Sequence, residues 1–127
     1  MKLLLDTHAF LWFLGGDSLL SNKAKTLIKN PKNEKYISIA AFWEIAIKQS
    51  LGKLTLGVSF AELKSETIKN GFQILPITFN DTLRLTTLPF HHRDPFDRII
   101  ISQAMENDLT LLSCDSNFNL YDLKLVW

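Results

Sequence analysis

The stretch His91-His92-Arg93-Asp94-Pro95-Phe96-Asp97-Arg98, with the run that follows it to Asp115, decides the expected fold. Asp94 before Pro95 has the form of a helix N-cap followed by proline at the first helical position. Apolar residues then recur at helical spacing, which predicts a helix with one buried face: Phe96, Ile99, Ile100 and Ala104. Residues 110–113 indicate a short buried strand, and Asp115 follows its carboxyl end. This stretch therefore places acids at the start of a helix and after the end of a strand. Acids elsewhere in the chain are candidates to join them.

Length and composition favour one soluble, cytoplasmic domain over residues 1–127. Apolar residues make up 46% of the chain and charged residues 21%, values that are ordinary for a globular protein. A net charge of +1 argues against non-specific coating of nucleic acid, but a nuclease needs only a local basic rim. The single Cys114 excludes an internal disulfide and suits a reducing compartment. Asp6 and His8 interrupt the apolar start, so we expect neither a signal peptide nor a membrane span.

Short apolar runs alternate with segments of helical periodicity along the chain. The expected strands are 2–5, 36–39, 72–75, 110–113 and 123–126. The expected helices are 7–14, 21–30, 40–51, 59–70, 78–88 and the one that follows Asp94, while 54–58 is either a connector or a small strand. This alternation predicts an α/β fold: a three-layer α/β/α sandwich around a central, mainly parallel five-stranded sheet.

Four acids from distant parts of the chain are expected at one edge of this sheet. Asp6 and Asp115 follow strands, whereas Glu44 and Asp97 lie in early turns of helices near the same edge. Clustered carboxylates raise one another's pKa, and a hard divalent cation removes that cost. One or two Mg²⁺ or Mn²⁺ ions at such a site match phosphodiester hydrolysis. Three basic side chains are expected to contact phosphates at the rim: Lys48, Arg93 and Arg98.

Simpler roles exist for each of these residues. Any one of Asp6, Asp94 and Asp115 can be a helix or turn cap, and Asp97 can complete the capping box of Asp94. Glu44 and Lys48 can form an ordinary i,i+4 pair. Caps, however, have no reason to gather at one sheet edge, so the joint placement favours a metal site.

Other side chains are expected to pack rather than to react. His91 and His92 point in different directions as neighbours, which argues against joint metal ligation. Trp12 and Trp43 can stack on bases, but packing in the core or at an interface fits them better. Cys114 lacks the surroundings of a nucleophile and is expected to be a small buried residue.

The ordered set of motifs resembles the PIN-domain family, and within it the VapC-type toxins of toxin–antitoxin pairs. The resemblance covers essentially the whole chain. It is carried by Leu3-Leu4-Leu5-Asp6-Thr7-His8, Ala41-Phe42-Trp43-Glu44-Ile45, the segment from Asp94 to Ala104, and Leu111-Leu112-Ser113-Cys114-Asp115, with Gly52-Lys53-Leu54 between them.

This resemblance implies a Mg²⁺- or Mn²⁺-dependent endoribonuclease with a PIN-like fold. Asp6, Glu44, Asp97 and Asp115 match the family's acidic metal-binding set, and Asp94 is an accessory acid. Thr7, Ser38 and Ser113 match small hydroxyl positions that orient carboxylates or waters. The family implies RNA as substrate, a cognate antitoxin as partner, and a homodimer. An apolar surface for such partners is expected around residues 10–14, about half of which can equally be core.

Two alternatives remain. One is a PIN-fold nuclease with a housekeeping role on RNA or DNA, although the short chain lacks added arms. The other is a Mg²⁺-binding receiver-like signalling module. A receiver would place an acidic pair after its first strand and an acceptor Asp after its third, whereas Asp6 stands alone and Pro76 follows residues 72–75.

Overall fold

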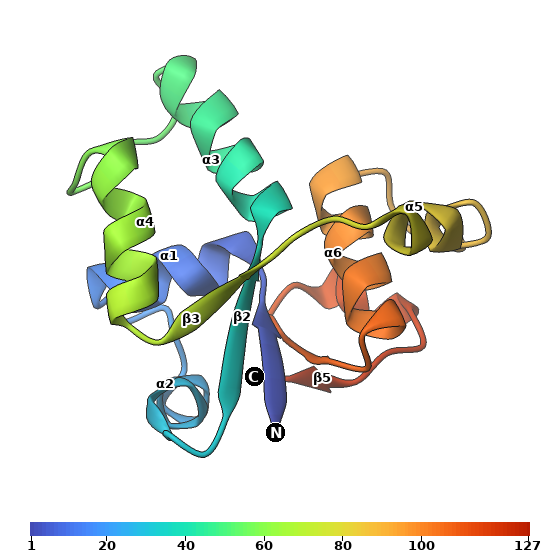
Figure 1. The fold of residues 1–127 in the computed structure, drawn as a ribbon. Coiled ribbons are helices and arrows are strands. Elements are labelled where there is room, and N and C mark those ends of the chain that lie inside the picture. Colours follow the sequence, from blue (N-terminus) through green and yellow to red (C-terminus); the bar gives the residue numbers. More distant parts are fainter.

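The computed structural model describes all residues 1–127. Its strands form a central sheet, and helices pack on both faces of that sheet (Figure 1). The strands are β1 (Lys2–Leu5), β2 (Glu34–Ser38), β3 (Phe72–Leu75), β4 (Thr110–Leu112) and β5 (Leu125–Val126). The helices are α1 (Thr7–Gly15), α2 (Asn22–Lys29), α3 (Ile39–Ser50), α4 (Phe60–Lys69), α5 (Phe79–Leu85) and α6 (Pro95–Glu106), with the 3₁₀ helix η1 at Ser116–Leu120.

The sheet has the strand order β3-β2-β1-β4-β5, and every neighbouring pair is parallel. The predicted α/β/α sandwich with a parallel five-stranded sheet is therefore confirmed. The chain runs outward from β1 to β2 and β3, and later returns to place β4 on the other side of β1. In open α/β sheets this reversal of direction leaves a crevice beyond the carboxyl ends of the strands. Residues that follow β1 and β4 consequently border the crevice.

Two apolar cores lie on the two faces of the sheet. One includes Leu3, Leu5, Phe10 and Ile45 and is covered by α1, α2, α3 and α4. The other includes Leu4 and residues of α6, together with Phe118 of η1. Leu4 points to one core and its neighbours in β1 to the other, so β1 is covered on both faces and carries no polar side chain between Leu3 and Leu5.

Local signals place the helix ends. Asp94 caps α6 by accepting from the backbone N–H groups of Phe96 and Asp97. Thr78 and Asp81 form the reciprocal capping box of α5. Ser59 caps α4 by accepting from the N–H of Glu62.

Several expected boundaries change. Residues 54–58 form no strand, α5 ends at Leu85 rather than at 88, and β5 is limited to Leu125–Val126. Cys114 is exposed rather than buried. Trp43, expected in the core or at an interface, is 62% exposed and so lies outside the core. No helix of the structure is both long enough and apolar enough to span a membrane.

Candidate active site

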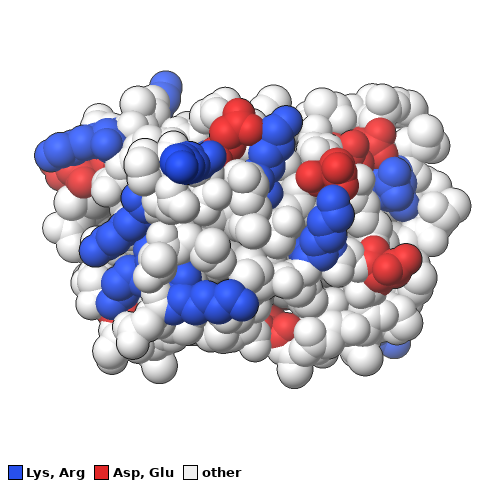
Figure 2. All heavy atoms as spheres, turned by 90° about the horizontal axis from the view of Figure 1, so that it is seen from below, with Lys and Arg blue, Asp and Glu red and all other residues white.

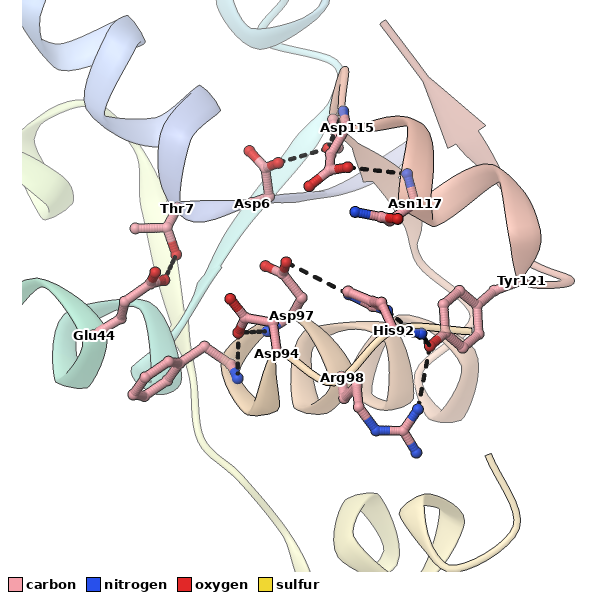
Figure 3. A network of polar contacts seen from close by, with 12 residues as sticks. Asp6, Thr7, Glu44, His92, Asp94, Asp97, Arg98, Asp115, Asn117 and Tyr121 are labelled. Atoms are coloured by element: carbon pink, nitrogen blue, oxygen red, sulfur yellow. Dashed lines mark hydrogen bonds and ion pairs between the residues drawn. The ribbon is translucent and has the colours of Figure 1, made fainter. Parts of the chain in front are cut away.

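The predicted acids meet at the crevice between β1 and β4 (Figure 3). Asp6 follows β1 directly, and Asp115 lies three residues after the end of β4. Glu44 reaches the same region from α3, while Asp94 and Asp97 arrive at the first turn of α6. The negative charges of Glu44, Asp6, Asp94 and Asp115 all act on Asp97.

Asp6 is buried and its carboxylate is held at both oxygens. Oδ1 accepts the backbone N–H of Ala9 at 2.8 Å, so Asp6 is also the N-cap of α1. Oδ2 accepts the hydroxyl of Ser113 at 2.5 Å. Burial raises the pKa of Asp6, the bonds from Ser113 and Ala9 lower it, and the nearby Asp115 raises it again. The Asp6 side chain therefore both caps α1 and contributes a carboxylate to the candidate site.

Glu44 is buried, with 6% of its surface exposed, and two side chains hold its carboxylate. The hydroxyl of Thr7 donates to Oε1 at 2.7 Å, and Lys48 Nζ lies 2.8 Å from Oε2. The Lys48 side chain is 41% exposed, so this i,i+4 pair joins a buried carboxylate to solvent. Glu44 and Lys48 are thus more than an exposed helix pair.

Asp97 is the acid of this site that the other carboxylates surround. Its pKa is raised to about 7, first by burial and then by the negative charges of Asp94, Glu44, Asp6 and Asp115. No lysine or arginine lies within ion-pair distance of its carboxylate, and His92 Nε2 stands 3.5 Å from Oδ2. A carboxylate among carboxylates, without a strong cationic partner, is the condition that a bound cation relieves.

The accessory residues divide between site and scaffold. Asp115 receives the N–H of Asn117 and caps η1, and its own N–H donates to Ser113. Ser113 therefore links Asp6 to Asp115. Ser38 is fully buried but caps α3 through Ala40 N–H and bonds no carboxylate.

One residue predicted to bind RNA lies elsewhere. The Arg98 side chain is buried, with its guanidinium donating to the carbonyl oxygens of Leu88 and Pro89 and to the hydroxyl of Tyr121. A group satisfied in this way does not serve as a phosphate contact at the rim, so that prediction is wrong for Arg98. Arg93 is exposed at the start of the same segment.

The donor set fits a hydrated divalent cation. Every candidate ligand is a carboxylate oxygen, the kind that Mg²⁺ and Mn²⁺ prefer. No three His, Cys, Asp or Glu side chains lie close enough to enclose an ion by themselves. Mg²⁺ commonly uses one or two carboxylates, several waters and substrate phosphates, so an open arrangement suits it better than a closed cage.

The sequence matches the model of the PIN domain over residues 3–124. The chain belongs to the PIN-domain family. This agrees with the predicted resemblance and with the acids at the switch point of the sheet. A comparison with curated proteins finds no sequence that matches this PIN domain.

Solved structures with the same fold include toxin–antitoxin complexes. VapBC2 from Rickettsia felis, bound to a promoter DNA fragment, has a TM-score of 0.71 at 18% identity, covering 99% of this chain and 98% of that one. A toxin–antitoxin complex from Klebsiella pneumoniae gives 0.66 at 18% identity over 98% and 95%. VapC20 of Mycobacterium tuberculosis, a sarcin-ricin loop cleaving toxin, gives 0.65 at 13% identity over 95% of each chain. At these identities the likeness shows that this PIN domain shares their fold.

The contacts of Tyr121 were not predicted from the sequence. Its hydroxyl lies 2.8 Å from His92 Nδ1 and accepts from Arg98 Nη1 at 3.1 Å. Tyr121 follows η1, far along the chain from both partners, and no local motif indicates this meeting. The one hint in the sequence is the run of histidine and arginine before Asp94, which places polar side chains close to the acids.

Proposed function

We propose that this PIN domain is a Mg²⁺- or Mn²⁺-dependent endoribonuclease and the toxin of a toxin–antitoxin pair. The observation that supports the proposal is the gathering of carboxylates from the end of β1, from α3, from α6 and from the segment after β4 around Asp97, whose pKa is raised first by burial and then by these neighbouring charges. Burial of unpaired acids costs stability, and a catalytic cation is the use that best accounts for keeping them.

The side chains have distinct tasks in this proposal. Asp6 and Asp97 are the central ligands. Asp6 is held by Ser113 and by the N–H of Ala9, whereas the one contact of the Asp97 carboxylate is His92 Nε2 at 3.5 Å. Glu44 and Asp115 add further negative charge around the cation, and Asp94 is an accessory acid. When bound, the cation polarises a phosphoryl oxygen and makes a bound water a stronger nucleophile at neutral pH.

The substrate and partners rest on likeness as well as on charge. RNA is favoured because VapC20, which shares the fold, is a sarcin-ricin loop cleaving toxin. Lys48 and Arg93, both with solvent access near the acids, are proposed to contact its phosphates. An antitoxin partner is favoured because several structures with this fold are toxin–antitoxin complexes.

A homodimer is also proposed. Exposed apolar side chains recur along α3 and at its end, which provides surface for protein contacts: Ile39, Trp43, Ile47 and Leu51. The expected patch on α1 contributes less, because Phe10 is fully buried and residues 11–14 pack partly against the core.

The experiment is cleavage of RNA by the purified chain with Mg²⁺, with Mn²⁺ and with a chelator, followed by analysis of the product ends. We expect cleavage only with a divalent cation, leaving a 5′-phosphate and a 3′-hydroxyl. A 2′,3′-cyclic phosphate, or cutting that survives the chelator, would contradict the mechanism. A matched DNA strand tests the alternative of a PIN nuclease with a DNA role.

Co-expression tests the toxin assignment separately from the chemistry. We expect expression of the chain to arrest growth, and a small protein encoded in a neighbouring reading frame to restore it by binding the chain. Normal growth with an active purified nuclease would favour the alternative of a PIN nuclease with a housekeeping role.

A further inference from the structure

His92 lies beside Asp97 with one ring nitrogen unused. Its side chain is only 11% exposed, and its ring packs edge-on against Phe118 and Tyr121 at centroid distances of 6.0 and 5.4 Å. Nε2 is buried and has no hydrogen-bond partner, although Asp97 Oδ2 lies 3.5 Å away. A buried polar atom without a partner is unfavourable and calls for an explanation.

The other ring nitrogen decides where the imidazole proton sits. Arg98 Nη1 donates to the Tyr121 hydroxyl oxygen at 3.1 Å, and the backbone N–H of His92 donates to the same oxygen at 3.4 Å. Arginine stays protonated and can only donate, so these two bonds occupy the acceptor positions of that oxygen. The hydroxyl hydrogen is left to point at His92 Nδ1, 2.8 Å away. Nδ1 is therefore an acceptor, and the neutral ring carries its hydrogen on Nε2.

The chain of contacts is anchored at its far end. Arg98 also donates to the carbonyl oxygens of Pro89 at 2.7 Å and Leu88 at 3.1 Å, and its guanidinium stacks 3.9 Å from the ring centre of Phe90. With Arg98 fixed, the Tyr121 hydroxyl has one free direction, toward His92. Figure 3 shows this series of contacts, which runs from Arg98 through Tyr121 and His92 to Asp97.

We propose that His92 is a positioning residue, whose Nε2–H, fixed by Tyr121 and Arg98, orients the Asp97 carboxylate. The present separation of 3.5 Å exceeds the usual 2.7–3.2 Å of an N–H···O bond. The terminal torsion of an aspartate is broad, so turning the carboxylate can shorten the contact without moving the backbone. The other oxygen of Asp97 then stays available to a cation held between Asp97 and the neighbouring acids. The effect on catalysis rests on the proposed function, because it requires Asp97 to bind the cation.

The first test reads the tautomer directly and needs neither cation nor substrate. In ¹⁵N NMR of the full chain in chelator, at a pH where His92 is neutral, we expect the proton on Nε2. In Tyr121→Phe, which keeps the ring and loses the hydroxyl, we expect the Nδ1–H form to appear alongside it. A wild-type His92 protonated on Nδ1 would overturn the proposal, as would a tautomer unchanged by Tyr121→Phe.

The second test compares two amide substitutions that differ in where the donor lies. His92→Gln can place an N–H near the Nε2 position, whereas His92→Asn keeps an amide only near Tyr121. By calorimetric titration, we expect Mn²⁺ binding in His92→Asn to weaken by about 10- to 100-fold. We expect binding in His92→Gln to stay within a few-fold of wild type. His91→Asn, which changes a ring that touches Tyr121 but not Asp97, is the matched control and should bind as wild type does.

The outcomes separate the two proposals. If wild type binds Mn²⁺ and cleaves RNA while His92→Asn does both equally well, the role of His92 is overturned and the proposed function stands. If wild type binds no Mn²⁺, the proposed function is overturned, and the tautomer measurement still decides whether His92 is held as described. Equal losses in His92→Gln and His92→Asn would point to packing alone and overturn the donor role.

Discussion

Acidic residues lie at both ends of the sheet, but their surroundings differ. At the amino ends of the strands, Lys2 lies 3.9 Å from Glu34, and Lys124 lies 2.7 Å from Asp108. Figure 2 shows this face, where basic and acidic side chains are intermixed. At the carboxyl ends, carboxylates from four parts of the chain gather, and Lys48 is the one lysine or arginine within ion-pair distance of any of them.

The difference appears in the pKa values. The hydrogen bond and charge of Lys124 lower the pKa of Asp108, whereas burial and four neighbouring acids raise that of Asp97 to about 7. Exposed pairs contribute little to stability and are easily replaced, while a buried group of like charges costs stability in the absence of a cation. Whether a group of acids indicates a cation site therefore depends on whether lysines or arginines already pair with them, and not on how many acids there are.

The largest expected effect comes from replacing an acid at the carboxyl end. Asp6→Asn and Asp97→Asn keep the shape of the side chain and remove one charge from the cation site. We expect the rate of RNA cleavage to fall about 1000-fold, since a metal supplies several kcal/mol of transition-state stabilisation and each 1.36 kcal/mol is a factor of ten. Asp108→Asn at the other end is the control and should cleave normally. Undiminished cleavage by either site variant would contradict the assignment.

The next effect is stabilisation of the fold by the cation. At 100 times its Kd, a ligand that binds only the folded state adds about 2.7 kcal/mol to the free energy of unfolding. For a domain of this length that corresponds to a rise in Tm of about 10 °C. Thermal unfolding with and without Mn²⁺ measures it. We expect the rise in wild type and Asp108→Asn and its loss in Asp97→Asn; a rise that persists in Asp97→Asn would place the cation elsewhere.

The pH dependence of stability should have opposite signs at the two ends. The pKa of Asp97 is about 7 in the folded chain against 3.8 for the free side chain, so the folded state holds more protons between these values. Its contribution to the free energy of unfolding therefore falls as pH rises through this window. Asp108, with a lowered pKa, contributes stability above 3.8 that is lost as pH falls.

Denaturant unfolding in chelator, at pH 5 and pH 8, tests this difference. We expect Asp97→Asn to lose less stability between the two values than wild type does, because the substituted side chain does not ionise. Asp108→Asn should retain the wild-type difference, since Asp108 is ionised at both values. Identical pH dependence in wild type and Asp97→Asn would show that the charge of Asp97 is already neutralised within the folded chain.

The smallest effect is expected at the exposed pair of the amino end. Lys2 and Glu34 are both at least half exposed and 3.9 Å apart. Lys2→Ala should change the free energy of unfolding by less than about 1 kcal/mol and leave cleavage unaltered. Denaturant unfolding and the RNA assay measure the two quantities. A loss of cleavage would extend the functional surface to the end of the sheet opposite the acids.

Features set by neighbouring residues could be predicted from the sequence. The cap at Asp94 depends on residues two and three positions further along the chain, and it forms as expected. The meeting of Asp6 with Asp115 was also predictable, because parallel strands end at one edge of a sheet. Periodicity therefore located both the fold and the acidic group.

Features set by distant segments could not be predicted in the same way. The spacing of Arg98 placed it near the helix start, but its burial depends on the carbonyls of Leu88 and Pro89 and on Tyr121. Cys114 follows a buried strand and was expected inside, yet the chain turns outward there before η1. In both cases the outcome depends on how a loop returns, which periodicity does not encode.

Direct titration of the purified chain with Mn²⁺, followed by calorimetry in parallel with Asp97→Asn and Asp108→Asn, tests the central claim most simply. The account predicts saturable binding by wild type and Asp108→Asn, and binding by Asp97→Asn that is lost or weakened at least tenfold. Equal binding by all three chains, or none by wild type, would contradict it.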